Sequence, residues 1–381
     1  MKAPFVAGVT GTNGKTTVVE FARQLLCAAG LRTASFGSRG VVDGDGTVTA
    51  GSVGRGRDAL PRLCERLGAD GHEAVVLEAF SVALARRLHD DLDVAAAAFT
   101  NLGQDHLDYH RSPDRYLRAK CRLFETVLCP GGTAVLLPDA PGAAQVIQAC
   151  RRARRSIVTC GPGRDLSATR LEPIGGRLVI EIGGFGRTAA LTVATDHELL
   201  VDDVLLAAGL AVVAGVDLAG LSGAHLEPPP ARMERLGVHR GAEVFLDTGH
   251  NPAALEAALG ALRGPTGRLI VVLGCGGNRD PGKRTPMGEV AARLADEVVV
   301  TDDNPRGEDP EAIRAAVLQG CPEATEIADR VTAIRHALDR AGPGDRVLVT
   351  GKGDEQRQLV SGRALPHSDR RAAMEVIGVT T

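Results

Sequence analysis

The chain has 381 residues, of which 44% are hydrophobic and 24% charged, a composition typical of folded globular proteins rather than disordered or fibrous ones. A net charge of −3, an aromatic content of 3% and the absence of Trp argue against a nucleic-acid partner. No apolar run is long enough to span a membrane, and no signal-peptide pattern opens the sequence, so we expect a cytoplasmic protein without a membrane partner. Eight scattered cysteines without a CxxC pair favour reduced thiols over a zinc site or disulfides.

The first half of the chain alternates short apolar runs with helix-like segments. Residues 5–10, 74–77 and 94–99 are apolar runs bounded by polar or glycine-rich segments, which predicts buried strands. Apolar positions follow helical spacing between Gly14 and Gly30. Another helix is predicted to begin at Ser112, which offers a capping hydroxyl before Pro113 and Asp114 in the first turn. Residues 133–195 are β-rich and less regular.

Three consecutive prolines at 228–230 cannot continue a helix and predict a stiff boundary between two domains, 1–227 and 228–381. Beyond them, strands are predicted at 244–246, 269–273, 298–301 and 347–349, with helical patterns between. This alternation predicts an α/β fold in which a mostly parallel sheet is wrapped by helices, once in each half.

A glycine-rich segment, GVTGTNGKTT at 8–17, follows the first strand and opens the first helix. We interpret it as a phosphate-binding P-loop, because backbone N–H groups at a helix N-terminus attract phosphate, a lysine adds charge and a hydroxyl can hold Mg²⁺. ATP is favoured over GTP, since no Asn-Lys-x-Asp element for guanine occurs. The predicted nucleotide contacts are Gly11, Thr12, Asn13, Gly14, Lys15, Thr16 and Thr17.

Three further side chains stand out near the predicted strand ends. Glu78 closes an apolar strand and His106 follows the strand that ends at Phe99, and both are candidate metal ligands. Lys120 falls inside the apolar stripe of the helix after Pro113. A lysine there can extend its ammonium to solvent, pair with an acid, or lose its proton and carry a modification, and the residues alone leave these outcomes open.

These segments together resemble the Mur ligase family, most closely the ligases that add the third amino acid to the peptidoglycan stem peptide. The matching stretches run in family order through almost the whole chain: GTNGKTT (11–17), FTNLGQDHLDYH (99–110), YLRAKCRLF (116–124), ARMERL (231–236), DTGHNPAALEAAL (247–259), GCGGNRDPGKRTPMGEVA (274–291), TDDNPRGEDPEAI (301–313) and TGKGDE (350–355).

The resemblance implies a P-loop ATPase middle domain followed by a Rossmann-like C-terminal domain. It implies ATP-dependent amide formation, in which a carboxylate takes the γ-phosphate to give an acyl phosphate and an amine then displaces phosphate. The partners would be a small-molecule acid and an amino acid, with ATP and two Mg²⁺ ions as cofactors. Lys120 would be carbamylated by CO₂, which turns a cation into an anionic metal ligand.

The resemblance also assigns site residues. Thr16 and Glu78 would hold the first Mg²⁺, and His106 with carbamylated Lys120 the second, so that the catalytic group is Lys15, Glu78, His106 and Lys120. On the C-terminal side, the implied nucleotide contacts are Arg232, Asp247, His250 and Asn251. The implied amine site comprises Arg279, Asp303, Asn304, Arg306, Gly351 and Glu355, with Arg306 on the distal carboxylate of diaminopimelate.

Departures from the family pattern affect the acid substrate. The chain begins where the family's middle domain begins, so we expect the N-terminal domain that binds UDP to be lacking. Arg55-Gly56-Arg57 replaces a threonine-rich stretch that helps to hold the carrier peptide, and Arg55 and Arg57 become candidate acid contacts. We therefore expect a small non-UDP carboxylate in a specialised biosynthetic pathway. The alternatives are a peptidoglycan ligase whose UDP domain is supplied by a partner chain, a less favoured folylpolyglutamate-synthetase-like ligase, and a non-catalytic nucleotide-binding regulator.

Overall fold

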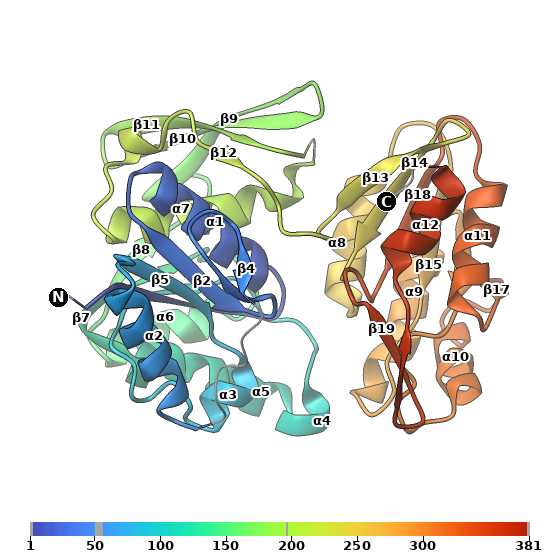
Figure 1. Cartoon of the computed structure of the whole chain (residues 1–381), viewed down its shortest axis with the longest axis horizontal. Coiled ribbons are helices and arrows are strands. Elements are labelled where there is room, and N and C mark those ends of the chain that lie inside the picture. The colour runs from blue at the N-terminus through green and yellow to red at the C-terminus, as the bar shows by residue number, and fades with distance from the viewer. Residues whose placement is uncertain (1–2, 50–55, 196, 379–381) are drawn as a thin grey trace. The chain divides into compact units, whose positions relative to one another are not determined.

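The structure is a computed structural model that describes residues 3–49, 56–195 and 197–378. These residues form two compact units (Figure 1). The first comprises the described residues up to Gly103 together with Tyr109–Pro229, and the second comprises Gln104–Asp108 and the described residues from Pro230 onward. None of the helices in the described part of the chain is both long and apolar enough to cross a membrane.

The first unit is built on an eight-stranded sheet with the order β4-β3-β2-β5-β1-β6-β7-β8. Strands β2, β5, β1, β6, β7 and β8 run parallel, and β3 and β4 add an antiparallel edge. The strands are β1 (Phe5–Thr10), β2 (Thr33–Gly37), β3 (Gly40–Val42), β4 (Val48–Thr49), β5 (Ala74–Glu78), β6 (Val94–Phe99), β7 (Leu128–Leu136) and β8 (Ser156–Thr159).

Alternate residues of the central strands feed two separate cores. Ala7 and Val9 of β1 pack with α1 (Lys15–Ala28) and α7 (Val201–Val213), whereas Val6 packs on the other face with α2 (Ala59–Ala69) and α6 (Ala143–Arg152). Helices α3 (Ser81–Ala85), α4 (Leu107–His110) and α5 (Pro113–Arg122) follow β5 and β6, and α5 continues into a π-helical turn at Leu123–Val127.

A second, four-stranded sheet covers the outer side of α7 in the first unit. Its order is β12-β11-β10-β9, from β9 (Leu166–Ile174), β10 (Arg177–Gly184), β11 (Arg187–Val193) and β12 (His225–Leu226). Its inward residues Ile180, Ile182 and Leu191 join the same core as α1 and α7. The β-rich middle of the sequence is thus divided: β7 and β8 extend the parallel sheet, whereas β9, β10 and β11 form an antiparallel layer over helices.

The second unit has a six-stranded sheet with the order β13-β14-β18-β15-β16-β17, in which only β13 is antiparallel among the described strands. The strands are β13 (Glu234–His239), β14 (Ala242–Asp247), β15 (Leu269–Leu273), β16 (Glu297–Val300), β17 (Thr325–Glu326) and β18 (Arg346–Thr350). One face packs against α11 (Arg330–Arg340) and α12 (Asp369–Ile377). Helices α8 (Pro252–Leu262), α9 (Arg284–Leu294) and α10 (Pro310–Leu318) follow β14, β15 and β16.

A two-stranded hairpin, β19 (Arg357–Val360) with β20 (Arg363–Pro366), lies between β18 and α12 in the chain. It does not join the main sheet, but its residues bond to the loop after β16: Arg306 forms an isolated bridge with Val360. This hairpin was not anticipated from the sequence, because its alternation is short and most of its side chains are exposed.

The α/β class and the parallel sheets predicted from the sequence are confirmed. Strands at 5–10, 94–99 and 269–273 have the predicted bounds, and the others extend by one or two residues at an end or shift by one. The predicted cap of α5 is also present, since Ser112 Oγ accepts a hydrogen bond from Arg115 N at 3.3 Å. In both units the parallel strands place their carboxyl ends at one edge, where the predicted phosphate, metal and amine contacts gather. The predicted acid contact Arg57 is an exception, and Arg55 lies outside the described residues.

Candidate active site

The glycine-rich loop between β1 and α1 is fixed by hydrogen bonds to the segment that follows β6. Thr12 N donates to the Asn101 carbonyl at 2.8 Å, and Asn13 N donates to Oδ1 of Asn101 at 3.1 Å. Gly11 has φ +154°, and a Cβ there would lie 1.8 Å from Thr100 Oγ1. Only glycine fits at this position, so the close backbone approach that fixes the loop depends on it.

The loop departs slightly from the usual P-loop spacing. Five residues, 9–13, separate Gly8 from Gly14, one more than in the G-x-x-x-x-G-K-[S/T] pattern. The essential context is nevertheless present, since Lys15, Thr16 and Thr17 form the first turn of α1. Lys15 Nζ donates to the carbonyls of Gly11 at 3.0 Å and Thr12 at 2.7 Å. The ammonium therefore lies over the loop, beside the N–H groups that a phosphate would meet.

Thr16 and Glu78, the predicted ligands of the first metal ion, are in direct contact. Thr16 Oγ1 donates to Glu78 Oε1 at 3.0 Å, and the same oxygen accepts from Ser38 N at 2.9 Å and Ser38 Oγ at 3.0 Å. Glu78 is buried at the end of β5. A hydroxyl and a carboxylate held this way are the oxygen ligands that Mg²⁺ prefers.

A complete protein cage for a metal is not found here. The described residues contain no group of three or more His, Cys, Asp or Glu side chains that could hold an ion. The donor set still fits Mg²⁺, which commonly takes one or two protein oxygens and completes its coordination with water and phosphate.

Lys120 is buried on the inner side of α5 with 1% of its surface exposed. Its Nζ donates to the Gly11 carbonyl at 2.6 Å and lies 4.1 Å from the centre of the Tyr116 ring. Tyr116 in turn places its hydroxyl 3.2 Å from Thr12 Oγ1. The lysine therefore does not extend to solvent, which removes one of the three outcomes left open by the sequence, and α5 contacts the phosphate loop through two side chains.

His106, the fourth predicted metal ligand, belongs to the second unit with Gln104–Asp108, whereas Thr16, Glu78 and Lys120 belong to the first. His106 Nε2 lies 3.6 Å from Asp105 Oδ2, and His250 Nε2 lies 3.4 Å from the same oxygen. Burial alone would raise the pKa of Asp105, but the hydrogen bond and charge of His250, with the charges of His106 and Lys283, hold it far below its usual range. Asp105 is therefore an anion that faces two imidazoles.

The predicted nucleotide contacts of the second unit gather where β14 ends. Asp247 accepts from Gly249 N at 2.6 Å and from Met233 N at 3.0 Å, which fixes the turn toward α8. Asn251 is fully buried and caps α8 by accepting from Ala254 N at 3.0 Å.

Arg232 and His250 meet at the same turn through Thr248. Arg232 Nη1 donates to Thr248 Oγ1, and His250 Nδ1 lies 2.9 Å from the Thr248 carbonyl. Arg232, Asp247, His250 and Asn251 are thus brought together at the carboxyl end of a parallel strand, the position where ligands of such sheets bind.

Arg306 is held by main-chain carbonyls in the loop after β16. Its Nη1 donates to the carbonyls of Gly277 at 2.9 Å and Asn304 at 3.3 Å. No hydrogen bond from Nε or Nη2 reaches another residue in the described part of the chain. Burial and the neighbouring Arg279 guanidinium lower the pKa of Arg306, against the opposing charges of Asp303 and Glu355. The two arginines together favour an anion beside them.

Hydrogen bonds from the β19–β20 hairpin fix the backbone around Arg306. Arg306 has φ +56°, an unusual conformation for a residue with a side chain. Its N–H donates to the Leu359 carbonyl at 2.8 Å, and its carbonyl accepts from Ser361 N at 2.6 Å. Gln358 Nε2 donates to the Asp303 carbonyl at 2.7 Å. The hairpin therefore fixes the direction in which the Arg306 side chain projects from the backbone.

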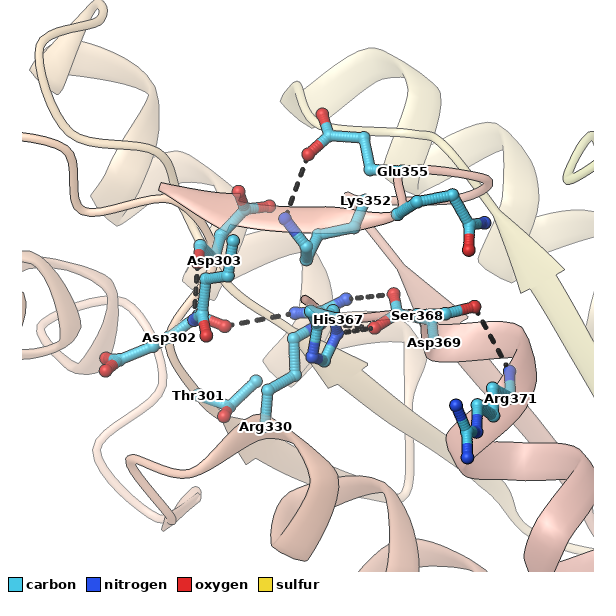
Figure 2. Close-up of polar contacts among 12 residues, drawn as sticks. Thr301, Asp302, Asp303, Arg330, Lys352, Glu355, His367, Ser368, Asp369 and Arg371 are labelled. Carbon is cyan, nitrogen blue, oxygen red and sulfur yellow. Dashed lines mark hydrogen bonds and ion pairs between the residues drawn. The ribbon is translucent and has the colours of Figure 1, made fainter. Parts of the chain in front are cut away.

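Glu355 and Asn304 are joined by a buried lysine that the sequence analysis did not single out. Asn304 Nδ2 donates to Glu355 Oε2 at 2.8 Å. Lys352 Nζ donates to the same oxygen at 2.9 Å, the contact that Figure 2 shows. The hydrogen bonds and charges of Asn304, Lys352 and Arg306 outweigh the effect of burial and lower the pKa of Glu355. The sequence pointed to Lys352 only through its place in the matched motif TGKGDE, between the predicted amine-site residues Gly351 and Glu355.

A buried ion pair lies beneath these loops. Arg330 bonds to both oxygens of Asp369, at 2.8 and 2.7 Å, and His367 Nε2 lies 2.8 Å from Asp369 Oδ1 (Figure 2). Arg330 Nη2 also donates to the Thr350 carbonyl at 2.8 Å, at the residue before Gly351. Burial would raise the pKa of Asp369, but Arg330 and His367 hold it well below its usual range. The pair thus fixes the end of β18.

The two predicted acid contacts lie apart from these clusters. Arg55 lies outside the described residues. Arg57 precedes α2, and its Nη2 lies 2.9 Å from Asp91 Oδ1, with more than half of both side chains exposed. Arg57 is therefore placed at the surface of the first unit in a solvent-accessible ion pair.

Comparison with known proteins covers most of the chain. Residues 9–174 match the Mur ligase middle domain, and residues 231–353 match the Mur ligase, glutamate ligase domain. A UDP-N-acetylmuramoyl-L-alanyl-D-glutamate--2,6-diaminopimelate ligase from Bradyrhizobium diazoefficiens is 40% identical over 377 residues, which are 96% of this chain and 77% of that protein. The ligase of the same name from Chelativorans sp. is 42% identical over 383 residues, 97% of this chain and 78% of its own length.

Solved structures agree with these relatives. A UDP-N-acetylmuramoyl-L-alanyl-D-glutamate--2,6-diaminopimelate ligase superimposes with a TM-score of 0.64 at 30% identity, covering 99% of this chain and 79% of that one. A Mycobacterium tuberculosis folylpolyglutamate synthase complexed with ADP and AMPPCP gives a TM-score of 0.74 at 20% identity, covering 99% and 92%, and shares the fold. The phosphate loop, the strand-end clusters and these matches together show that the chain belongs to the Mur ligase family, as an ATP-dependent acid–amino-acid ligase that forms an amide bond with release of ADP and phosphate.

Proposed function

We propose that this ligase joins 2,6-diaminopimelate to UDP-N-acetylmuramoyl-L-alanyl-D-glutamate. The names of relatives that are 40% and 42% identical over nearly the whole chain support this acid substrate. They favour it over the small non-UDP carboxylate expected from the sequence. That expectation rested on a UDP-binding domain expected to be lacking and on departures in short segments such as 55–57. In this reading Arg55 and Arg57 remain candidate contacts of the acid substrate.

The observation that carries the choice of amine is the way Arg306 is held. Two main-chain carbonyls anchor one side of its guanidinium, so the remaining N–H groups are available for a carboxylate. Arg279 adds a second positive charge, and the Glu355 carboxylate offers a partner for an ammonium group. Diaminopimelate carries both kinds of group at its distal end, whereas lysine lacks the carboxylate. Asp303, Asn304 and Gly351 complete this proposed site.

ATP is proposed to bind chiefly to the domain at residues 1–227, with amine recognition in the domain at 228–381. Gly11, Thr12, Asn13, Gly14 and Thr17 supply backbone and helix N-terminal donors to the phosphates, and Lys15 supplies charge. Arg232, Asp247, His250 and Asn251 are the proposed nucleotide contacts of the second domain. In the reaction, the acid's carboxylate takes the γ-phosphate, and the amine nitrogen then attacks the acyl carbon and displaces phosphate.

Two Mg²⁺ ions are proposed to be held by Thr16 and Glu78 and by His106 and Lys120. When bound, Mg²⁺ neutralises charge on a transferring phosphoryl group. Lys120 would serve as its carbamate, formed when the neutral amine adds to CO₂ with release of one proton. Its burial against the phosphate loop supports this, because an anion there would suit a metal better than an ammonium does. The N–H of a carbamate could still donate to the Gly11 carbonyl.

The test is a matrix of acids and amines with ATP, read by phosphate release and by product mass. We expect product from the UDP-linked dipeptide with diaminopimelate, and little with lysine or glutamate as the amine. Product from a simple carboxylic acid, without turnover of the UDP compound, would restore the small-acid hypothesis. ATP binding without phosphate release under any pairing would instead support a non-catalytic regulator.

A further inference from the structure

Lys352 lies at the centre of the loops that form the proposed amine site. Its side chain is fully buried, and its three ammonium protons have three acceptors at 2.9 Å: Asn304 Oδ1, Glu355 Oε2 and the Arg357 carbonyl. These acceptors come from the loop after β16, the loop after β18 and the first residue of β19. One ammonium therefore ties the loop after β16 to the stretch that leads from β18 into β19.

The backbone conformation on both sides of Lys352 lets its side chain point into the protein interior. Gly353 has φ +56°, and a Cβ there would lie 1.9 Å from Thr248 Cγ2. Only glycine permits the chain to turn this tightly against the β14–α8 turn. The preceding residue, Gly351, follows the strand end that Arg330 holds through the Thr350 carbonyl. The path of the main chain thus directs Lys352 inward and leaves Glu355 half-exposed.

The lysine determines how two binding groups are presented. Asn304 Oδ1 accepts from both Lys352 Nζ and Leu359 N, at 2.9 and 2.8 Å, so the amide can only turn its Nδ2 toward Glu355. Both donors to Glu355 converge on Oε2, and no hydrogen bond to Oε1 is found among the described residues. The second oxygen is left for a ligand, while the first is anchored.

We propose that Lys352 is a positioning residue for the amine substrate: it orients Asn304 and keeps the Glu355 carboxylate ionised, with one oxygen directed at the substrate ammonium. The inference rests on the proposed amine site, and assigns a role to a side chain that would not itself touch the substrate. The charged groups that act on Glu355 are Lys352 from its own loop and Arg306 from the loop after β16, and Arg330 from α11 also interacts with it.

The variant Lys352→Met removes the ammonium and keeps most of the side-chain volume. We expect the KM for diaminopimelate to rise about 10- to 100-fold, while the KM for ATP stays within about threefold of wild type. A matched control is Arg268→Met. Arg268 pairs with Asp345 at 2.7 Å, next to the first residues of β15 and β18 and so at the opposite end of these strands. The control loses a cation from a carboxylate pair in the same unit, but its KM for the amine should not change.

A pH profile separates positioning from simple loss of stability. Only the ionised Glu355 attracts an ammonium, so amine affinity falls as the pH drops through the pKa of this carboxyl group. Without Lys352 that pKa rises, and the acid limb of the 1/KM profile for the amine should move up by about one pH unit or more. A carbon-13 NMR titration of Glu355 in the ligand-free protein should show the same upward shift. An unchanged titration in Lys352→Met would overturn the proposal whatever the substrate proves to be.

If Lys352→Met folds poorly, the double variant Lys352→Met with Glu355→Gln can be used instead. It removes both charges of the ion pair and so leaves no buried charge without a partner. If Lys352 acts through Glu355, the double variant should match Glu355→Gln in amine KM within about threefold. Fully additive effects would show that the lysine acts by another route. Failure of the wild-type protein to join diaminopimelate to the UDP dipeptide would count against the proposed function alone, since the NMR titration does not depend on turnover.

Discussion

The phosphate loop of the first unit and the amine site of the second are assembled in different ways. The phosphate loop is one continuous segment, fixed by main-chain and hydroxyl hydrogen bonds from residues 100–103. The amine site is drawn from four segments, near 277–279, 303–306, 351–355 and 357–361, above the buried pair of Arg330 and Asp369. The residues of the phosphate loop come from one stretch of the chain, although partners 88 and 91 positions further along fix it. The residues of the amine site come together only when several segments have packed.

In both regions some ligand-facing charges are held by neutral partners, although Glu355 of the amine site is ion-paired with Lys352 through one oxygen. Lys15 and Arg306 are held by carbonyls, and Glu78 by hydroxyl and amide donors. A charge whose partners are neutral can still attract a ligand of opposite charge, whereas the fields of two opposite charges in a pair largely cancel. Arg330 and Asp369, which satisfy one another, serve the framework instead. This difference separates Lys15, Arg306 and Glu78 from the supporting pair and can be tested residue by residue.

The largest effect should come from Lys120, the buried cation beside the phosphate loop. Lys120→Ala is expected to lower kcat about 1,000-fold or more, because it removes the proposed anionic metal ligand. Lys120→Arg should not restore activity, since arginine stays cationic. The measurement is steady-state ligation, with added acetate or chloride tested for partial rescue and circular dichroism as the folding control. Near-normal turnover of the alanine variant in bicarbonate-free buffer would exclude the carbamate.

The next effect concerns the framework of the second unit. Asp369→Asn should lower the free energy of unfolding by about 3–5 kcal/mol at neutral pH, because Arg330 is left as a buried charge without its anion. The pKa of Asp369 is lowered by folding, so its stabilisation is fully present above the unfolded value of about 4 and is lost as the pH falls toward the folded value. Urea denaturation at several pH values should show the difference from wild type shrinking below about pH 4. A difference that stays constant into acid would refute this assignment.

A smaller effect, confined to one substrate, is expected at Arg306. Arg306→Ala should raise the KM for diaminopimelate about 10- to 1,000-fold and leave the KM for ATP nearly unchanged, because a charge-assisted contact to one carboxylate is lost. Arg279→Ala is the matched comparison, since it removes the neighbouring charge and leaves Arg306 anchored. If lysine proved to be the preferred amine and Arg306→Ala had no kinetic effect, the amine assignment would be wrong.

The smallest effect should come from Arg57. Its pair with Asp91 is more than half exposed, so any contact with the acid substrate is screened by solvent. Arg57→Ala is expected to raise the KM for the UDP dipeptide only about fivefold, corresponding to roughly 1 kcal/mol. Asp91→Ala should change this KM in the opposite direction or not at all. A 100-fold loss, measured by initial rates, would instead place Arg57 at the centre of the acid site.

The sequence predicted the local features better than the assembled ones. The strand, loop and first helix around Lys15 follow from neighbouring residues, and so does the helix that begins at Ser112. Lys120 was singled out because a lysine breaks the apolar stripe of that helix, and the structure decides against the solvent-extended lysine that the sequence had left open. The hairpin at 357–366 was missed because its alternation is short and most of its side chains are exposed. The pairing of Lys352 with Asn304 was missed because it joins residues 48 positions apart in the chain. No local pattern reports such contacts.

The hairpin has a consequence for any attempt to redesign the amine preference. The match to the glutamate ligase domain ends at residue 353, before the hairpin begins. Yet the main chain of Arg306 is bonded on both its N–H and its carbonyl by hairpin residues, which sustain its left-handed conformation. Grafting the four residues Asp303–Asn304–Pro305–Arg306 into another ligase would therefore transfer the arginine without its orientation. A redesign that aims to transfer amine specificity must therefore move the loop after β16 together with the β19–β20 hairpin.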